Sequence, residues 1–299
     1  MFSGVYTIMP TPFQDDGSLD LPSLEKLTAF LANQGVDGVV VLGVMGEAPK
    51  LSQKEQDEVI TTTVKAAGEM PVFAGSGAAG TDLAVEKSLN ALSLGAAGLL
   101  VAPPPVQNDA VIFEYYRRIN EQVSGTIILH DYPAATGIRL SPELVKKLHD
   151  ELKQVTVIKL EETPSAPKVS ALRKLGSDIS IVGGLGGMFF LEELERGSSG
   201  MMTGFSYPEI LVAIHKAYTA GDREEAARIF YEACPLLRYE FQPGIGLALR
   251  KEVYRQRGAI ASAFVRHPGV QIDEQMRNEL ANVLAFCQLD EVVGNEVRA

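Results

Sequence analysis

Short apolar segments alternate with longer amphipathic segments along most of the chain. The apolar segments are rich in β-branched residues and leucine, and they cover residues 5–10, 38–43, 72–75, 98–102, 127–132, 155–159, 179–183 and 200–204. Segments with apolar positions at helical spacing follow them, over residues 21–34, 53–67, 82–94, 110–122, 142–152, 166–175, 188–196 and 208–220. Strands that are apolar throughout, rather than at alternate positions, are typical of a parallel sheet covered on both faces. The pattern therefore predicts eight βα units.

The spacing of the predicted strands indicates how they are arranged. They begin about every 21 to 34 residues, which is the length of one βα unit. Eight strands with eight helices predict a closed (β/α)8 TIM barrel over residues 1–220, with a doubly wound open sheet as the alternative. From residue 221 the pattern is helical only, over 223–239, 244–256 and 273–288. It predicts a C-terminal extension of three helices, residues 221–299, packed on the barrel as part of one structural unit.

Composition and charge narrow the class of partner. The chain has 299 residues, of which 46% are hydrophobic, and a formal net charge of −11. An acidic chain disfavours nucleic acid and anionic membranes as partners, because both are bound by clustered Lys and Arg. The apolar runs are too short to span a bilayer, and the N-terminus lacks the basic segment of a signal peptide. Cys234 and Cys287 are 53 positions apart and are expected to be buried thiols in a reducing compartment. These features predict a cytoplasmic enzyme.

Common cofactor and metal motifs are incomplete in this sequence. Residues 75–80 read GSGAAG, a formal dinucleotide-binding motif, but the next strand ends in LVAP, without the carboxylate that would bind the ribose. The four histidines are scattered, and no serine lies in a GxSxG motif. We therefore expect no cofactor and no metal. His130 could be a ligand or a base, but its position in the middle of a strand favours a core histidine with an internal partner.

Lys159 is the first candidate for chemistry. It ends the apolar run 155–159, whereas the other lysines fall in helix-like or turn segments. The carboxyl end of a barrel strand faces the active-site mouth. An ammonium that loses hydration there loses its proton more readily, and the free amine can attack a carbonyl carbon. The alternative is a lysine neutralised by Glu161 or Glu162, which would serve a salt bridge or a phosphate site.

Tyr132 ends the preceding predicted strand, one βα unit before Lys159. Because adjacent strands lie about 4.8 Å apart, the two side chains can converge over one pocket. A phenol close to an imine can move protons to and from the substrate oxygen. The alternative is a rim tyrosine that is hydrogen-bonded to the backbone.

The loop after the second strand reads Gly43-Val-Met-Gly-Glu47. Its two glycines allow backbone N–H groups to point toward one small anion such as a carboxylate. The alternative is an ordinary glycine-rich turn.

Taken together, these segments resemble the dihydrodipicolinate synthase / N-acetylneuraminate lyase family of class I aldolases. The matching motifs occur in the family order and cover nearly the whole chain: Gly43-x-x-Gly46-Glu47, Tyr132 with Thr136-Gly137, Ile158-Lys159, Gly183-Gly184 and the helical extension. The resemblance implies a cofactor-free (β/α)8 barrel that forms a homo-oligomer, usually a tetramer. It also implies that Lys159 forms an imine with pyruvate or another 2-keto acid while Tyr132 relays protons. The backbone at Val44 and Met45 would hold the keto-acid carboxylate, and Gly46, Gly184 and Met202 are expected to line the substrate site as well.

Several positions depart from the family pattern. Val44 and Met45 stand where the family usually has two hydroxyl residues, so those hydroxyl donors are missing. Residues 102–106 read APPPV and lack the tyrosine that reaches a neighbouring subunit's site. No arginine precedes Thr136-Gly137, and Arg139 is offset from that place.

These departures disfavour a true 4-hydroxy-tetrahydrodipicolinate synthase. The run KLEETP after Ile158 is closer to the 2-keto-3-deoxy sugar acid branch of the family. The sequence therefore predicts a Schiff-base lyase that makes or breaks a C–C bond between a 2-keto acid and an aldehyde. A 2-keto-3-deoxy sugar acid dehydratase that uses the same imine, and a non-catalytic keto-acid sensor, are the alternatives.

Overall fold

The computed structural model describes residues 2–289, and it contains a closed barrel of eight parallel strands in the order β1 to β8. The strands are Gly4–Ile8 (β1), Gly38–Val41 (β2), Val72–Gly75 (β3), Gly98–Val101 (β4), Thr126–Asp131 (β5), Val155–Leu160 (β6), Ser180–Gly183 (β7) and Gly200–Thr203 (β8). The predicted (β/α)8 barrel is therefore confirmed, and the open sheet is excluded.

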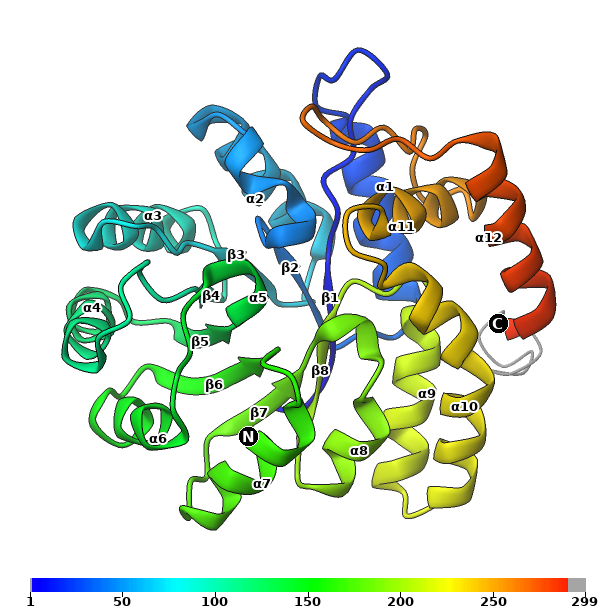
Figure 1. The fold of residues 1–299 in the computed structure, drawn as a ribbon. Helices are drawn as coiled ribbons and strands as arrows, with labels where there is room; N and C mark the ends of the chain where they lie inside the picture. The colour runs from blue at the N-terminus through cyan, green and yellow to red at the C-terminus, as the bar shows by residue number, and fades with distance from the viewer. Residues whose placement is uncertain (1, 290–299) are drawn as a thin grey trace.

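Helices surround the barrel in chain order (Figure 1). They are Leu21–Asn33 (α1), Gln53–Ala67 (α2), Thr81–Ser93 (α3), Asp109–Gln122 (α4), Pro142–Glu151 (α6), Ser165–Lys174 (α7), Phe190–Glu195 (α8) and Pro208–Thr219 (α9). Side-chain caps fix several starts: in α2, Ser52 and Glu55 form a reciprocal capping box. A short helix, Pro133–Thr136 (α5), and three 3-10 turns, at Val44–Gly46, Ala48–Lys50 and Leu185–Gly187, were not predicted.

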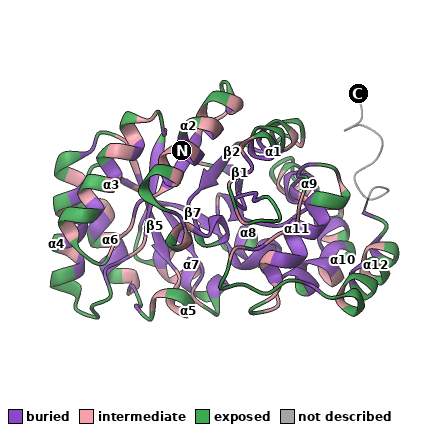
Figure 2. Cartoon of the chain, turned by 90° about the horizontal axis from the view of Figure 1, so that it is seen from above, coloured by how far each residue is buried: buried purple, intermediate pink, exposed green. Residues whose placement is uncertain are grey.

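Strand residues alternate between two apolar layers, as the two-residue period of a β-strand requires. One layer fills the inside of the barrel, with Ile8, Val40, Ile128, Val157 and Met202 among its members. The other layer joins the outer face of the strands to the helices. Figure 2 shows this arrangement as buried strands in the centre and helices that are exposed on their outer faces. Both faces of the sheet are covered, which explains the uniformly apolar strands.

Three helices follow the barrel: Arg223–Glu240 (α10), Gly246–Gln256 (α11) and Glu274–Cys287 (α12). Helix α10 packs against α9 and α12, on the right of Figure 1. Helix α11 lies beside α1, where the rings of Phe30 and Tyr254 are 6.2 Å apart. Cys234 on α10 is half-buried, Cys287 on α12 is buried, and both are free thiols. Residues 290–299 of the predicted extension lie outside the described residues.

Candidate active site

Lys159 lies near the carboxyl end of β6 and is only 5% exposed. Val157, two residues earlier, belongs to the layer inside the barrel, so Lys159 shares that inward face. Its register partners are His130 on β5 and Val182 on β7. The strand therefore places the Lys159 amine inside the barrel, at the end where the active sites of such barrels lie.

Glu161 and His130 form a buried polar group with this lysine. Lys159 Nζ lies 2.6 Å from Glu161 Oε2, which in turn lies 2.8 Å from His130 Nε2. Lys159 Nζ and His130 Nε2 are 3.3 Å apart. The other carboxylate oxygen, Oε1, accepts a hydrogen bond of 2.9 Å from the backbone N–H of Leu185. The ion pair of Lys159 with Glu161, one of the alternatives from the sequence, is thus observed. Glu162 does not pair with Lys159; it pairs with Arg139 and Lys168.

Burial and neighbouring charges set the protonation of these groups. Burial, with the positive charge of Lys159, lowers the pKa of His130, although Glu161 opposes the change. Burial alone would raise the pKa of Glu161, but Lys159 and His130 outweigh burial and hold it well below its usual range. At neutral pH the group therefore consists of a neutral imidazole and an ionised carboxylate beside the amine. Such a group can stabilise a cation at Lys159 Nζ and exchange protons next to it.

Tyr132 directly follows β5 and begins the short helix α5. It is half-buried, and its ring lies 5.9 Å from the His130 ring, with an angle of 25° between the planes. Burial and the negative charge of Glu161 raise the pKa of the Tyr132 phenol, which Arg250 partly opposes. The phenol is therefore protonated at neutral pH and can donate a proton.

The loop after β2 carries two unpaired amides. Gly46 N–H donates to Gly43 O, and Glu47 N–H donates to Val44 O. Within residues 2–289, the N–H groups of Val44 and Met45 have no acceptor. Val44 is 59% exposed, whereas the Met45 side chain is buried in the layer inside the barrel. The loop has the two adjacent donors that the anion-binding prediction requires, but the N–H of Gly46 is already used.

Buried ion pairs hold this loop against the C-terminal extension. Glu47 accepts from Lys251 Nζ on α11 at 2.7 Å, from Lys50 Nζ at 2.8 Å and from the backbone N–H of Arg266 at 3.1 Å. Lys251 is fully buried, and its Nζ also donates to Phe264 O. Burial lowers the pKa of Lys251 to about 8, against the opposing charge of Glu47. The loop is therefore anchored from outside the barrel.

Two glycines make room for the site's side chains. A Cβ at Gly184 would lie 2.4 Å from Glu161 Cγ, so the glycine that directly follows β7 leaves the space that Glu161 fills. A Cβ at Gly204 would lie 1.7 Å from Met45 Sδ, so Gly204 does the same for Met45. Met202, expected to line the substrate site, is fully buried in the layer inside the barrel.

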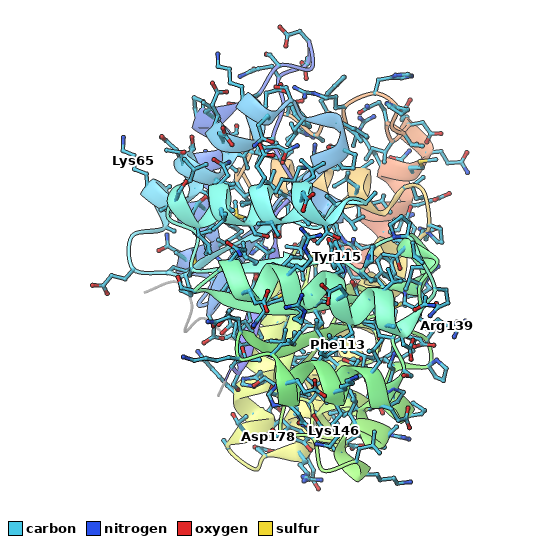
Figure 3. The ribbon with its side chains drawn as sticks, turned by 90° about the vertical axis from the view of Figure 1, so that its left-hand side faces the viewer. Lys65, Phe113, Tyr115, Arg139, Lys146 and Asp178 are labelled. Atoms are coloured by element: carbon cyan, nitrogen blue, oxygen red, sulfur yellow. The ribbon has the colours of Figure 1, made fainter. Side chains whose placement is uncertain are left out.

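Arg139 lies away from the polar group around Lys159. Its side chain is 69% exposed and pairs with Glu162 at 2.5 Å. Figure 3 shows it at the edge of the molecule. The arginine that the family places before Thr-Gly therefore has no counterpart in Arg139.

A cavity of about 660 Å³ opens at the ends of β2, β3, β4 and β5. Its lining includes Val44 from the loop after β2, His130 from β5 and Leu247 from α11. Most of the other lining residues are apolar or glycine. This volume and lining are typical of a site for one small molecule.

The sequence predicts Lys159 and Tyr132 as catalytic residues. For His130 it allows a ligand or a base but favours a core histidine, and it gives Glu161 only as a possible salt-bridge partner of Lys159. A signal was present, because His130 is two residues before Tyr132 and Glu161 is two residues after Lys159. The two-residue period of a strand, continued one residue past its end, places the members of each pair on the same side, and each pair is in contact in the structure.

Within the part of the chain that the structure describes, no group of three or more His, Cys, Asp or Glu residues is placed to hold a metal ion. None of the helices described is long and apolar enough to cross a membrane.

The fold and the site define a (β/α)8-barrel protein with a buried lysine and acid–base side chains at the carboxyl ends of adjacent strands. The sequence model of the dihydrodipicolinate synthetase family matches residues 1–286. The chain belongs to this family.

Relatives within the family differ in activity. An L-2-keto-3-deoxyarabonate dehydratase of Azospirillum brasilense is 32% identical, over 93% of this chain and 92% of the relative. The structure of dihydrodipicolinate synthase from Rhodopseudomonas palustris superposes with a TM-score of 0.91 at 36% identity, covering 95% of this chain and 97% of that one. YagE, a prophage protein of E. coli K12 solved in complex with pyruvate, has a TM-score of 0.90 at 25% identity, covering 97% of this chain and 99% of that one.

Proposed function

We propose that this protein is a Schiff-base lyase in which Lys159 forms an imine with pyruvate or another 2-keto acid. The observation that carries the proposal is the position of the Lys159 amine, which lies at a barrel strand end, 2.6 Å from Glu161 and 3.3 Å from His130. The amine would attack the keto carbon, and loss of water from the carbinolamine would give a protonated imine. Membership of the family and the pyruvate complex of YagE support the choice of a keto acid.

The neighbouring groups suit this chemistry. The protonated imine keeps a positive charge on Nζ, and the ionised Glu161 carboxylate stabilises that charge in a site with little water. The Tyr132 phenol would move protons to and from the carbinolamine oxygen. Removal of a proton from C3 would give an enamine, with the imine nitrogen taking up the electron pair. This enamine forms the C3–C4 bond by adding to an aldehyde. In the reverse direction, the imine of the longer acid breaks that bond and gives the enamine and the aldehyde.

Dehydration is the second candidate, favoured by the Glu161–His130 pair and by the dehydratase among the relatives. In a 2-keto-3-deoxy acid both reactions act on the C4 hydroxyl. Cleavage of the C3–C4 bond requires a base to take the hydroxyl proton. Dehydration requires an acid to protonate the hydroxyl as it leaves as water. The neutral His130 and the ionised Glu161 would first take the proton from C3 as the enamine forms, and the protonated pair would then give it to the hydroxyl that leaves as water.

Trapping with borohydride tests the imine directly. Reduction in the presence of pyruvate is expected to add one carboxyethyl group to the intact mass, located on Lys159 by peptide mapping. Lys159→Ala should give no adduct. Lys153→Ala, which removes an exposed lysine just before β6, should be trapped like the wild type. An adduct that persists in Lys159→Ala, or none in the wild type, contradicts the proposal and leaves the keto-acid sensor as the better interpretation.

A product assay separates the two reactions. A panel of 2-keto-3-deoxy sugar acids would be incubated with the enzyme, and the products identified by mass spectrometry. Release of pyruvate indicates C–C cleavage. A product lighter by one water, without pyruvate, indicates a dehydratase.

We also propose that the protein is a cytoplasmic homo-oligomer, a dimer or a tetramer. Exposed apolar side chains at Leu83, Val106 and Val111, on and beside α3 and α4, support an interface there. Light scattering after size-exclusion chromatography measures the number of subunits.

A further inference from the structure

Arg250 lies on α11, one helical turn after Leu247 and therefore on the same face of the helix. Leu247 lines the cavity and packs against the layer inside the barrel. Arg250 is buried, with 8% of its surface exposed. Its guanidinium group is thus held inside the protein, on the face of α11 that is turned toward the barrel mouth.

This guanidinium group has few partners for a buried cation. Its Nη1 donates to the thioether sulfur of Met45 at 3.5 Å, and thioethers are weak acceptors. Its Nε lies 3.4 Å from Glu240 Oε2, but that carboxylate already accepts hydrogen bonds from the hydroxyl and N–H groups of Ser206. Among the described residues, Nε and Nη2 have no hydrogen-bond partner. Buried donors without acceptors are uncommon, and they suggest an acceptor that arrives from outside the chain.

The unpaired nitrogens lie among the loops that form the site. Met45, which contacts Nη1, belongs to the loop after β2 and has a free amide. Nη2 lies 3.1 Å from the place that a Cβ at Gly186 would occupy, in the loop after β7 and two residues beyond Gly184. Arg250 is also close enough to Tyr132 to oppose, by its charge, the rise in the phenol's pKa that burial and Glu161 cause.

We propose that Arg250 binds the carboxylate of the 2-keto acid, together with the N–H groups of Val44 and Met45. The proposal rests on the proposed function, since it assumes that a keto acid enters this site. A guanidinium group offers two parallel N–H donors that match the two oxygens of a carboxylate. A carboxylate is a far stronger acceptor than the Met45 sulfur. The unbranched methionine side chain can turn aside to admit it.

The loop sequence supports this role. Val44 and Met45 provide backbone N–H groups but no hydroxyl groups, so the loop alone offers the carboxylate two uncharged donors. A charged donor on α11 would supply both the missing hydrogen bonds and the counter-charge. The site would then take its anion-binding group from the C-terminal extension.

Borohydride trapping as a function of pyruvate concentration tests the role of Arg250. In Arg250→Met, the pyruvate concentration for half-maximal trapping is expected to rise about 10- to 100-fold, the usual effect of losing hydrogen bonds to a charged group. The maximal amount of adduct should stay the same, since Lys159 is intact. Arg250→Lys keeps the charge but loses the planar pair of donors. Its pyruvate concentration for half-maximal trapping should lie between those of the wild type and Arg250→Met. Thermal melting checks that both variants are folded.

Methyl pyruvate, which has no negative charge, distinguishes binding from a structural effect. The methyl pyruvate concentration for half-maximal trapping should change less than about threefold in Arg250→Met, because no hydrogen bond to a charged carboxylate is lost. The proposal is overturned if the half-maximal concentration rises equally for both compounds, or if it does not rise for pyruvate.

A binding measurement without the imine keeps the two proposals separate. In Lys159→Ala, pyruvate should raise the melting temperature, and the further change Arg250→Met should remove that rise. A rise that persists in the double variant contradicts the role of Arg250. The failure of the wild type to form an adduct contradicts only the proposed function.

Discussion

Glu193, in α8, is a buried carboxyl group that we expect to be neutral in the folded protein at neutral pH. Its Oε1 accepts a hydrogen bond from the Ser165 hydroxyl. Its Oε2 has no partner among the described residues and lies 1.7 Å from the place of a Cβ at Gly183. Burial, reinforced by the negative charges of Glu161 and Glu192, raises the pKa of Glu193 from 4.5 to about 8.

This change in pKa links the stability of the fold to pH. Between pH 4.5 and 8 the folded protein holds a proton on Glu193 that the unfolded chain has lost. Stability therefore falls as the pH rises through this range, by about 1.4 kcal/mol per pH unit. From pH 5 to pH 7 the loss amounts to roughly 3 kcal/mol. Glu193→Gln has nearly the same shape and cannot ionise, so it should not suffer this loss.

Urea denaturation of both proteins at pH 5, 6 and 7 measures the effect. The free energy of unfolding of Glu193→Gln, relative to the wild type, is expected to increase by roughly 3 kcal/mol from pH 5 to pH 7. Costs that do not depend on pH, such as an unpaired amide N–H, cancel in this change. Glu195→Gln, on the exposed face of the same helix, is the control and should show no such increase. If the difference in free energy of unfolding between Glu193→Gln and the wild type stays constant from pH 5 to pH 7, the reasoning is refuted, since Glu193 would then be ionised in the folded state.

Two further predictions concern the proton relay and the loop anchor. Tyr132→Phe should still form the borohydride adduct, but its kcat should fall about 100- to 10,000-fold because the proton relay loses its hydroxyl group. Steady-state turnover within threefold of the wild type would exclude a relay role for Tyr132. Lys251→Met should lower the free energy of unfolding by about 3 kcal/mol, because Glu47 stays buried without its main counter-charge. Urea denaturation measures this loss, and a change below about 1 kcal/mol would mean that Lys50 and the Arg266 amide suffice.

The barrel and the position of Lys159 could be predicted because both depend on local periodicity. Uniformly apolar strands at regular spacing indicate parallel βα units, and the last residues of each strand then lie at one end of the barrel. That geometry predicts that Tyr132 and Lys159 lie close together, without any knowledge of the packing. The same period of two could have added His130 and Glu161, since each shares a face with one of those residues.

Arg250 could not be found in this way. It lies in a helical segment whose amphipathic pattern shows that one face is buried, but not what that face covers. Its contact with Met45 joins residues 205 positions apart, and no period connects them. The ion pair of Lys251 with Glu47 spans 204 positions and was missed for the same reason. Such contacts depend on how α11 docks over the barrel, which is a property of the tertiary fold.

The docking of α11 has a consequence for how this chain can change. The N-terminal half of α11 contributes Leu247 to the cavity lining, and Lys251 holds the helix to the loop after β2 through its ion pair with Glu47. One helix outside the eight βα repeats therefore shapes the pocket, whereas Lys159, the proposed nucleophile, is on a strand. If Arg250 binds the substrate as proposed, substitutions at Leu247 or Arg250 would alter which acids are accepted and leave Lys159 and its neighbours undisturbed. A chain cut after α9 could keep all eight strands and still lose one wall of its pocket. If Lys159 and Arg250 act as proposed, selectivity and reactivity are carried in this barrel by separate segments that can evolve at different rates.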